Sequence, residues 1–257
     1  FAQALLGPKK VQSDKTVQQD DKTVQQDDKA SSEHQASQSA HAALVSQWFV
    51  LLKELKTLGL GNDQIKTILE AKDSDRTPGL ARALQSDNPL AIKAYCEGLK
   101  TLGLEQDRAW IKSILEAKDL YRTPGLALAL KRDNPAAIKV YCEGVKGFAL
   151  NQDKAWIKSI FEAKDNQGAP GMAWALVCDN LATIKAYCEG LKILGLHQDT
   201  KWIKSIFEAR DNQGTLGLVG ALVRDKPAAI KAYFDEIKAL GLHQDTKWIK
   251  SIFEAKD

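Results

Sequence analysis

The chain has 257 residues, of which 44% are hydrophobic and 27% charged, a composition typical of a soluble globular protein. Its 36 basic and 33 acidic residues give a formal charge of only +3, which provides no electrostatic argument for binding nucleic acid or anionic lipid. No stretch approaches the roughly 20 consecutive apolar residues that a membrane-spanning helix needs.

The first segment, residues 1–43, is polar and contains the heptad DKTVQQD twice, at 14–20 and 21–27. A coiled coil would need two apolar positions in each of three or four heptads, whereas only one position is apolar here and only two copies hold it. We therefore expect this segment to be a solvated, disordered linker.

From Thr77 onward the sequence repeats every 46 residues, because TPGLARAL is followed by TPGLALAL, APGMAWAL and TLGLVGAL at that interval. A period this regular is typical of an array of stacked units. The predicted repeat domain, 44–257, contains units 74–119, 120–165, 166–211 and 212–257. Residues 44–73 match only the last two thirds of a unit, and we expect them to form a partial repeat that caps the array.

Each unit is predicted to contain three helices, as the second unit illustrates. Pro124 and Gly125 open a short helix that ends near Leu130. A second, amphipathic helix begins at Pro135 and ends near Gly147, and a third begins after Asp153, which is a good N-cap residue. No pattern in the sequence favours a β-strand, so the predicted fold class is all-α.

The run TPGLALALKRDNPAAIKVY, followed by EAKDNQG, resembles an ankyrin repeat. The unit is 13 residues longer than the roughly 33-residue ankyrin norm, about the length of its third helix. The PGL-x-x-AL opening is most similar to repeats of bacterial secreted effectors of the Shigella enterotoxin-like group. The resemblance implies a right-handed α-solenoid that docks a host or partner protein. Curvature like that of a three-helix armadillo array satisfies the same helix pattern.

The residues that most invite a catalytic interpretation are explained by packing. Cys96, Cys142 and Cys188 recur once per unit on an apolar helix face, and Phe234 stands at the same position in the last unit. No Cys-x-x-Cys or His-x-x-x-His pair offers metal-ligand spacing. We therefore expect free thiols in a reducing compartment, and no catalytic residue, metal or cofactor.

Two further repeated patterns are also expected to be structural. The tryptophans at 110, 156, 202 and 248 lie on the apolar stripe of the third helix, which predicts a core position. Lys112 and Glu116 stand four residues apart on the same helix in every unit, as do Lys93 and Glu97 on the second helix in all but the last. This spacing predicts ordinary ion pairs within one helix on a solvated face.

The positions at which the units differ are the best candidates for binding. They fall at one position of the first helix, at the end of that helix and in the turn between units. Together they predict an apolar and basic groove, the candidate surface, in which Trp174 either faces a ligand or only fills space between units. The residues of the candidate surface are Arg76, Arg82, Gln85, Tyr121, Leu128, Lys131, Arg132, Trp174, Val177 and Arg224.

The sequence therefore favours a monomeric, non-enzymatic module whose concave surface binds a partner protein. By resemblance, the partner is a host target of a bacterial effector in the host cytoplasm. Phe1 and Asp257 both look like cut ends, so an alternative is the targeting domain of a toxin or effector enzyme whose catalytic domain lies outside these residues. Binding to a nucleic-acid backbone through the lysine rows is a weaker alternative.

Overall fold

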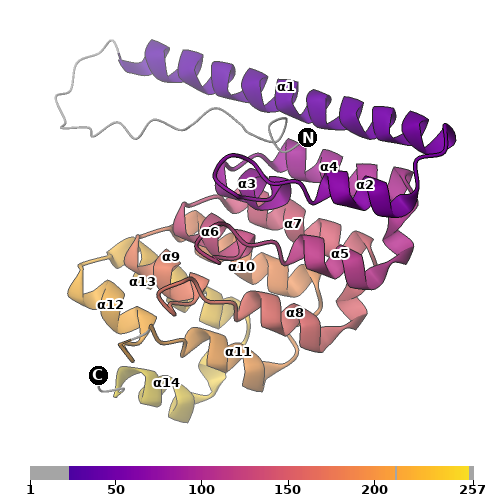
Figure 1. Ribbon diagram of the computed structural model, residues 1–257. Coiled ribbons are helices and arrows are strands. Elements are labelled where there is room, and N and C mark those ends of the chain that lie inside the picture. Colours follow the sequence, from indigo (N-terminus) through magenta and orange to yellow (C-terminus); the bar gives the residue numbers. More distant parts are fainter. Residues whose placement is uncertain (1–22, 212, 255–257) are drawn as a thin grey trace.

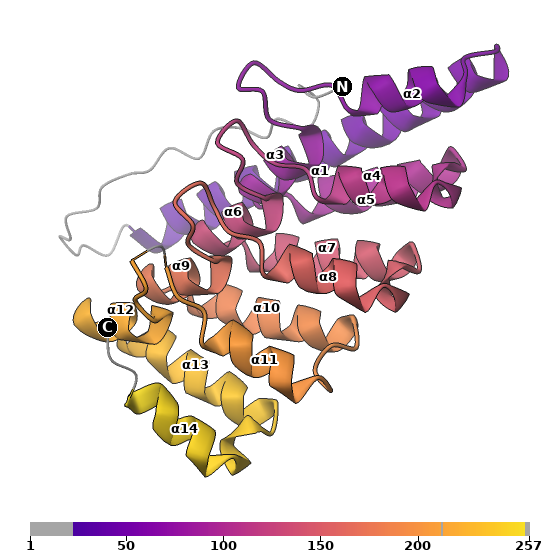
Figure 2. The same cartoon turned by 60° about the horizontal axis from the view of Figure 1, so that its bottom comes forward.

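The structure, a computed structural model, describes residues 23–211 and 213–254, with side chains from residue 33 onward. Over this part of the chain the fold is all-α, as the sequence predicts, and it contains no strand. Successive units lie one below another, so the helices form three rows (Figures 1 and 2).

The first row consists of the short helices that open the units, α3 (Gly79–Gln85), α6 (Gly125–Lys131), α9 (Gly171–Val177) and α12 (Gly217–Val223). The second row consists of the longer helices α4 (Pro89–Thr101), α7 (Pro135–Gly147), α10 (Leu181–Ile193) and α13 (Pro227–Ala239). The third row consists of α5 (Arg108–Leu115), α8 (Lys154–Phe161), α11 (Thr200–Phe207) and α14 (Thr246–Phe253). Short 3-10 turns precede three of the third-row helices, η2 (Leu104–Gln106), η3 (Leu150–Gln152) and η4 (Leu242–Gln244).

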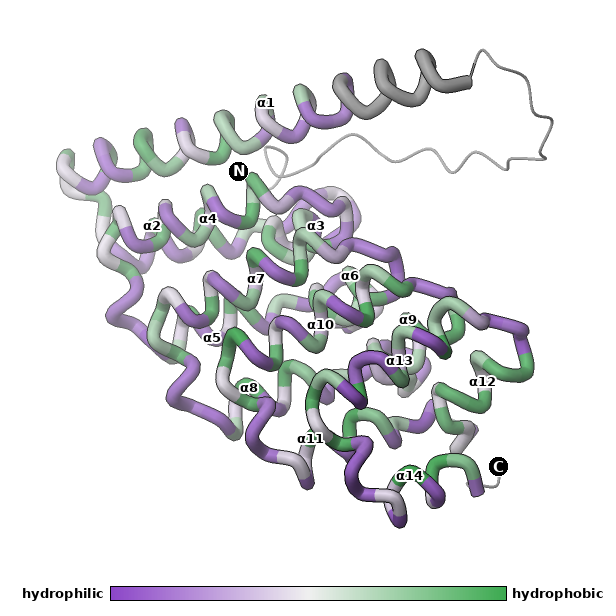
Figure 3. The backbone as a smooth tube through the Cα atoms, turned by 180° about the vertical axis from the view of Figure 1, so that it is seen from behind, coloured by the Kyte–Doolittle hydropathy of each residue, from purple (hydrophilic) through white to green (hydrophobic). Residues whose placement is uncertain are grey.

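Local sequence explains where these helices begin. Pro135 occupies the first turn of α7, where its missing N–H costs no hydrogen bond. The side chain of Asp153 accepts a hydrogen bond from the main-chain N–H of Trp156 and so caps α8, as the sequence predicts. Polar and apolar residues are interspersed along the helices of the second and third rows (Figure 3), so each of these helices has an apolar side to bury.

The prediction of a disordered linker is wrong for residues 23–43, which belong to the single long helix α1 (Thr23–Thr57); residues 1–22 lie outside the described residues. Val45, Phe49 and Leu52 are buried where α1 packs on α4. The segment from 23 to 44 contains neither glycine nor proline, so the helix that this packing anchors continues towards the N-terminus. Gln38 donates from Nε2 to the main-chain carbonyl of Asp87 at 2.7 Å and fixes this extension. The helix α2 (Asn62–Leu69) follows.

Helices of the second row pack closely because the first three units carry a glycine at the contact, Gly98, Gly144 and Gly190; the last unit has Glu236 at this position. A Cβ built on Gly144 would lie 2.7 Å from Sγ of Cys96 in the preceding unit, and one on Gly98 would lie 2.1 Å from Cγ of Phe49. The buried tyrosines of this row also join the rows together, since Tyr141 donates from its hydroxyl to the main-chain carbonyl of Leu115 at 2.8 Å. Equivalent bonds link Tyr187 to Phe161 and Tyr233 to Phe207.

Polar side chains of the third row link each unit to the next. Lys112 pairs with Asp153, and Glu116 accepts from the indole Nε1 of Trp156. The same two contacts recur at the other junctions, as Lys66 with Asp107, Lys158 with Asp199, Lys204 with Asp245, and Glu70, Glu162 and Glu208 with Trp110, Trp202 and Trp248. The prediction that Lys112 pairs with Glu116 inside one helix is therefore wrong. Only in the last unit does that pair form, between Lys250 and Glu254.

The tryptophans of this row are core residues, as predicted, and Trp156 is the most exposed of them, being half-buried. Two hydrogen bonds hold the pKa of Asp153 below its usual range. The bond from Lys112 has the larger effect, and the bond from the main-chain N–H of Trp156 the smaller. The carboxylate therefore stays ionised and serves both as a helix cap and as an ion-pair partner. The Asp153 side chain thus fixes where α8 begins and also holds α8 against the preceding unit.

Ala149 is strained, because its φ of 54° lies in the left-handed region where Gly103, Gly195 and Gly241 stand in the other units. We expect Ala149→Gly to raise the free energy of unfolding by about 0.5–1 kcal/mol, since glycine removes the Cβ strain at the cost of a more flexible unfolded chain. The reverse change, Gly103→Ala, is the matched control. A Cβ there meets nothing within 4 Å, so any loss reports on the backbone alone. Urea unfolding of both variants checks the prediction, and a loss of stability in Ala149→Gly would contradict it.

Candidate binding surface

A repeated turn joins each third-row helix to the next first-row helix and carries part of the candidate surface. In the second unit, Oδ1 of Asp119 accepts from the main-chain N–H groups of Tyr121 and Thr123 at 2.9 and 2.8 Å. An isolated antiparallel bridge pairs Lys118 with Pro124 across the turn. Asp73, Asp165 and Asp211 do the same in their turns. The tip is therefore a rigid support for its side chains, and Tyr121 is 64% exposed there.

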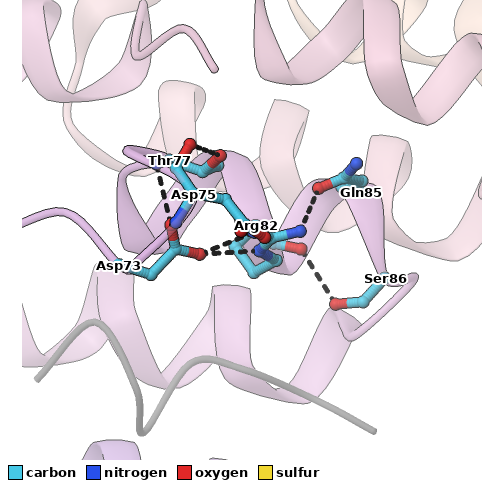
Figure 4. Close-up of polar contacts among 6 residues, drawn as sticks. All are labelled: Asp73, Asp75, Thr77, Arg82, Gln85 and Ser86. Carbon is cyan, nitrogen blue, oxygen red and sulfur yellow. Dashed lines mark hydrogen bonds and ion pairs between the residues drawn. The ribbon is translucent and has the colours of Figure 1, made fainter. Parts of the chain in front are cut away.

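The Asp73 turn also holds Arg82, a residue predicted to face the groove (Figure 4). The guanidinium of Arg82 forms ion pairs with Asp73 at 2.7 Å and Asp75 at 2.6 Å, and it donates to Oε1 of Gln85 at 2.8 Å. Its side chain is only 17% exposed. The hydrogen-bonding groups of Arg82 are thus taken up by Gln85 and by the two carboxylates of the turn. Arg76 at the tip of the turn is exposed.

Trp174 takes the place of Arg82 in the third unit and uses the equivalent carboxylate, since its Nε1 donates to Oδ2 of Asp165 at 2.7 Å. Leu128 holds the same position in the second unit and is 6% exposed, so its predicted place on an exposed surface is wrong. In the second unit this position belongs to α6, which packs between α3 and α9 in the first row. Variation at this position therefore reflects internal packing as well as any ligand.

The ends of the first-row helices form the exposed part of the candidate surface. Nζ of Lys131 lies 4.1 Å from the centre of the Trp174 ring, and Nδ2 of Asn180 donates to the main-chain carbonyl of Lys131 at 3.2 Å. These contacts join the end of α6 to α9 and to the start of α10. Trp174 is consequently half-buried, with its indole nitrogen bonded and Lys131 over its face.

Positive charge concentrates at these helix ends. Lys131, Arg132 and Arg224 are exposed, and Val177 at the end of α9 is half-buried. Partial desolvation of the guanidinium lowers the pKa of Arg132, and the charge of Arg82 lowers it further. Burial also raises the pKa of the Cys178 thiol, against the opposing effect of Lys131, Arg224 and Lys226. Exposed basic residues therefore lie at the helix ends of the second and fourth units, on either side of α9, and Lys131 and Arg224 both act on Cys178 at the end of that helix.

Several exposed apolar side chains were missing from the predicted surface. Val223 is 80% exposed beside Arg224, and Leu222 and Leu120 are also exposed. Val223 belongs to the helix-end pair at which the units differ, so comparing the units could have found it. Leu222 gives no such signal, because its equivalent in each other unit is also leucine. Those leucines are buried, and each lies on a helix that is followed by another first-row helix, whereas within the described residues none follows α12.

The described residues offer little for acid–base, nucleophilic or metal chemistry. Burial raises the pKa of the Cys96 thiol to about 12, and it raises those of Cys142 and Cys188 further still. All four cysteines are free, as expected from their spacing. No group of three or more His, Cys, Asp or Glu side chains in the described part of the chain could hold a metal ion. None of the described helices is long and apolar enough to cross a membrane.

Comparison of the chain with protein-family models and with curated proteins finds no match.

Proposed function

We propose that the chain is a non-enzymatic protein-interaction module, built as a right-handed α-solenoid of four ankyrin-like units with an N-terminal cap. The same contacts recur at each junction between units, which supports the solenoid. The bridged turns between units support the likeness to ankyrin repeats. The packed first row supports a continuous surface along the stack.

One observation carries the proposed function, the gathering of exposed basic and apolar side chains at the ends of α6 and α12. Lys131, Arg132 and Arg224 lie there with Val223, while the polar groups beneath them are already bonded to one another. Side chains that the fold does not use are available to a partner. We infer a partner with an acidic patch around an apolar anchor, and by resemblance to effector repeats a host protein.

Reversing two charges of the surface is expected to reduce partner capture about tenfold, because attraction at the rim becomes repulsion. The variant is Lys131→Glu/Arg132→Glu in the full chain, used as bait in a host-cell lysate with cross-linking mass spectrometry. Both side chains are exposed and the only inter-unit side-chain contact described for them is that of Lys131 with the Trp174 ring, so the circular dichroism spectrum is expected to stay near wild type and the urea midpoint to fall only slightly.

The matched control reverses two exposed lysines elsewhere, Lys53 on α1 and Lys146 on α7. Lys53→Glu/Lys146→Glu produces the same change in net charge and is expected to capture the same proteins as wild type. If both variants capture the partner as well as wild type does, the assignment of the surface is refuted. Equal loss in both would show that net charge alone drives the interaction.

A further inference from the structure

Two equivalent cavities lie away from the candidate surface, between the ends of consecutive third-row helices. The first, between α5 and α8, has a volume of about 250 Å³, and the second, between α8 and α11, about 280 Å³. Each also touches the start of the next first-row helix and a second-row tyrosine. None of their lining residues belongs to the candidate surface.

The floor of each cavity is apolar. In the first cavity it includes Leu126, Ile160 and the ring of Tyr141, and the Tyr141 hydroxyl already donates to the carbonyl of Leu115. In the second cavity Met172, Ile206 and Tyr187 take the same places. A site with this floor fits an aliphatic side chain of moderate size.

The rim of each cavity is basic. Lys118 and Lys164 line the first cavity, and Lys164 and Arg210 the second, so Lys164 is shared by both. Each cavity has a single carboxylate, Glu116 or Glu162, which already accepts from a tryptophan indole. Within the described residues no ion pair joins Lys118 or Lys164 to an acidic side chain. The rim therefore keeps positive charge that the fold does not neutralise.

The spacing of the cavities restricts the conformation of a ligand that fills both. Packed helices lie about 8–10 Å apart, so equivalent sites of consecutive units differ by about that distance. A polyproline II chain rises about 3.1 Å per residue and returns to the same side every third residue, after about 9.3 Å. A β-strand returns every second residue, after about 6.6 Å, and does not match.

We propose that this row of cavities binds an acidic peptide in the polyproline II conformation. An aliphatic residue at every third position enters successive cavities, and carboxylates between them face Lys118, Lys164 and Arg210. This site is distinct from the surface assigned under the proposed function, since it uses the third-row helices and the segments that follow them.

A labelled peptide of four Leu-Pro-Asp repeats tests the proposal by fluorescence anisotropy with the full chain. Saturable binding that weakens as salt rises is expected, because exposed charges are screened. Two control peptides are expected to bind at least about tenfold more weakly. Leu-Pro-Asp-Pro repeats break the three-residue spacing, and Leu-Pro-Lys repeats reverse the charge. Absence of binding, or equal binding of all three peptides, would overturn the proposal.

Two kinds of variant locate the site. Lys164→Glu changes the shared rim charge and is expected to weaken binding about tenfold, whereas Lys146→Glu on α7 is expected to leave it unchanged. Ala163→Leu places a larger side chain at the first cavity without changing charge, and Ala209→Leu does so at the second. Circular dichroism identifies any variant that fails to fold. Unchanged affinity in Lys164→Glu and in a folded Leu variant would overturn the assignment.

The surface variant Lys131→Glu/Arg132→Glu separates the two proposals. It is expected to bind the labelled peptide as wild type does while losing its captured partner. Loss of peptide binding in this variant would place the peptide on the candidate surface and overturn the cavity site. Failure of the peptide to bind wild type would leave the partner-capture experiment unaffected.

Discussion

Replacing Trp202 by alanine is expected to lower the free energy of unfolding by about 3–5 kcal/mol, the usual cost of removing a large aromatic side chain from a core. Trp202 is only 8% exposed, its indole donates to Glu162 in the preceding unit, and Lys158 lies 5.4 Å from its ring centre. The alanine variant loses the packing and both inter-unit contacts together. Urea unfolding followed by circular dichroism measures the loss.

Smaller changes at the same place separate packing from polar contacts. Trp202→Phe keeps most of the apolar area but removes the indole N–H, and its cost is expected to be about 1 kcal/mol, since the exposed Glu162 can turn to water. Because a repeat array can unfold in parts, hydrogen exchange should show the loss concentrated on the units that contain α8 and α11. A cost below about 1 kcal/mol for Trp202→Ala would contradict the core assignment.

Replacing Gly98 by alanine is expected to cost about 3 kcal/mol, at the upper end for overpacking. The new Cβ would lie 2.1–2.4 Å from three carbons of the Phe49 ring. That ring is buried and packs edge-on against Tyr95, at 5.6 Å between centres, so it has little room to move. We expect α1 to separate from α4, with protease cleavage in α1 and a reduced urea midpoint.

Gly147→Ala provides the matched control, because Gly147 lies on α7, the second-row helix of the next unit. Its Cβ would meet Nζ of Lys100 at 2.6 Å, but that atom ends a long, exposed side chain that can move aside. Alanine also favours a helix over glycine, so Gly147→Ala is expected to be neutral or slightly stabilising. Similar costs for the two variants would show that steric overlap with Phe49 is not the cause.

The helices inside one unit could be predicted because their signals are local. Proline at Pro135, the cap at Asp153 and the apolar stripe of α7 all act within a few residues. The contacts between units could not be predicted in the same way. Lys112 pairs with Asp153 and not with Glu116, because the offset between stacked helices, which no single unit encodes, sets which side chains meet.

The candidate surface could be predicted only in part, because contacts between units decide which of its residues are exposed. Variation among the units identified Lys131, Arg132 and Arg224, which are exposed. It also selected Leu128, which is buried, because variation marks a position where packing differs as readily as one where a ligand binds. The helical extension of α1 from residue 23 was missed because its polar composition hid a segment free of helix breakers.

The links between units give the stack a direction. Lys158 and Glu162 at the end of the second unit meet Asp199 and Trp202, and the last unit offers the same Asp and Trp groups at 245 and 248. Removing residues 166–211 would therefore join two ends that already match. Residues 44–73 differ, since Gly61 and Gln64 stand where the units carry Asp and Trp, so this segment lacks the carboxylate and the indole that the other junctions use. Loss of residues 166–211 would let Lys158 and Glu162 meet Asp245 and Trp248, so this change of length keeps both polar contacts of the third row.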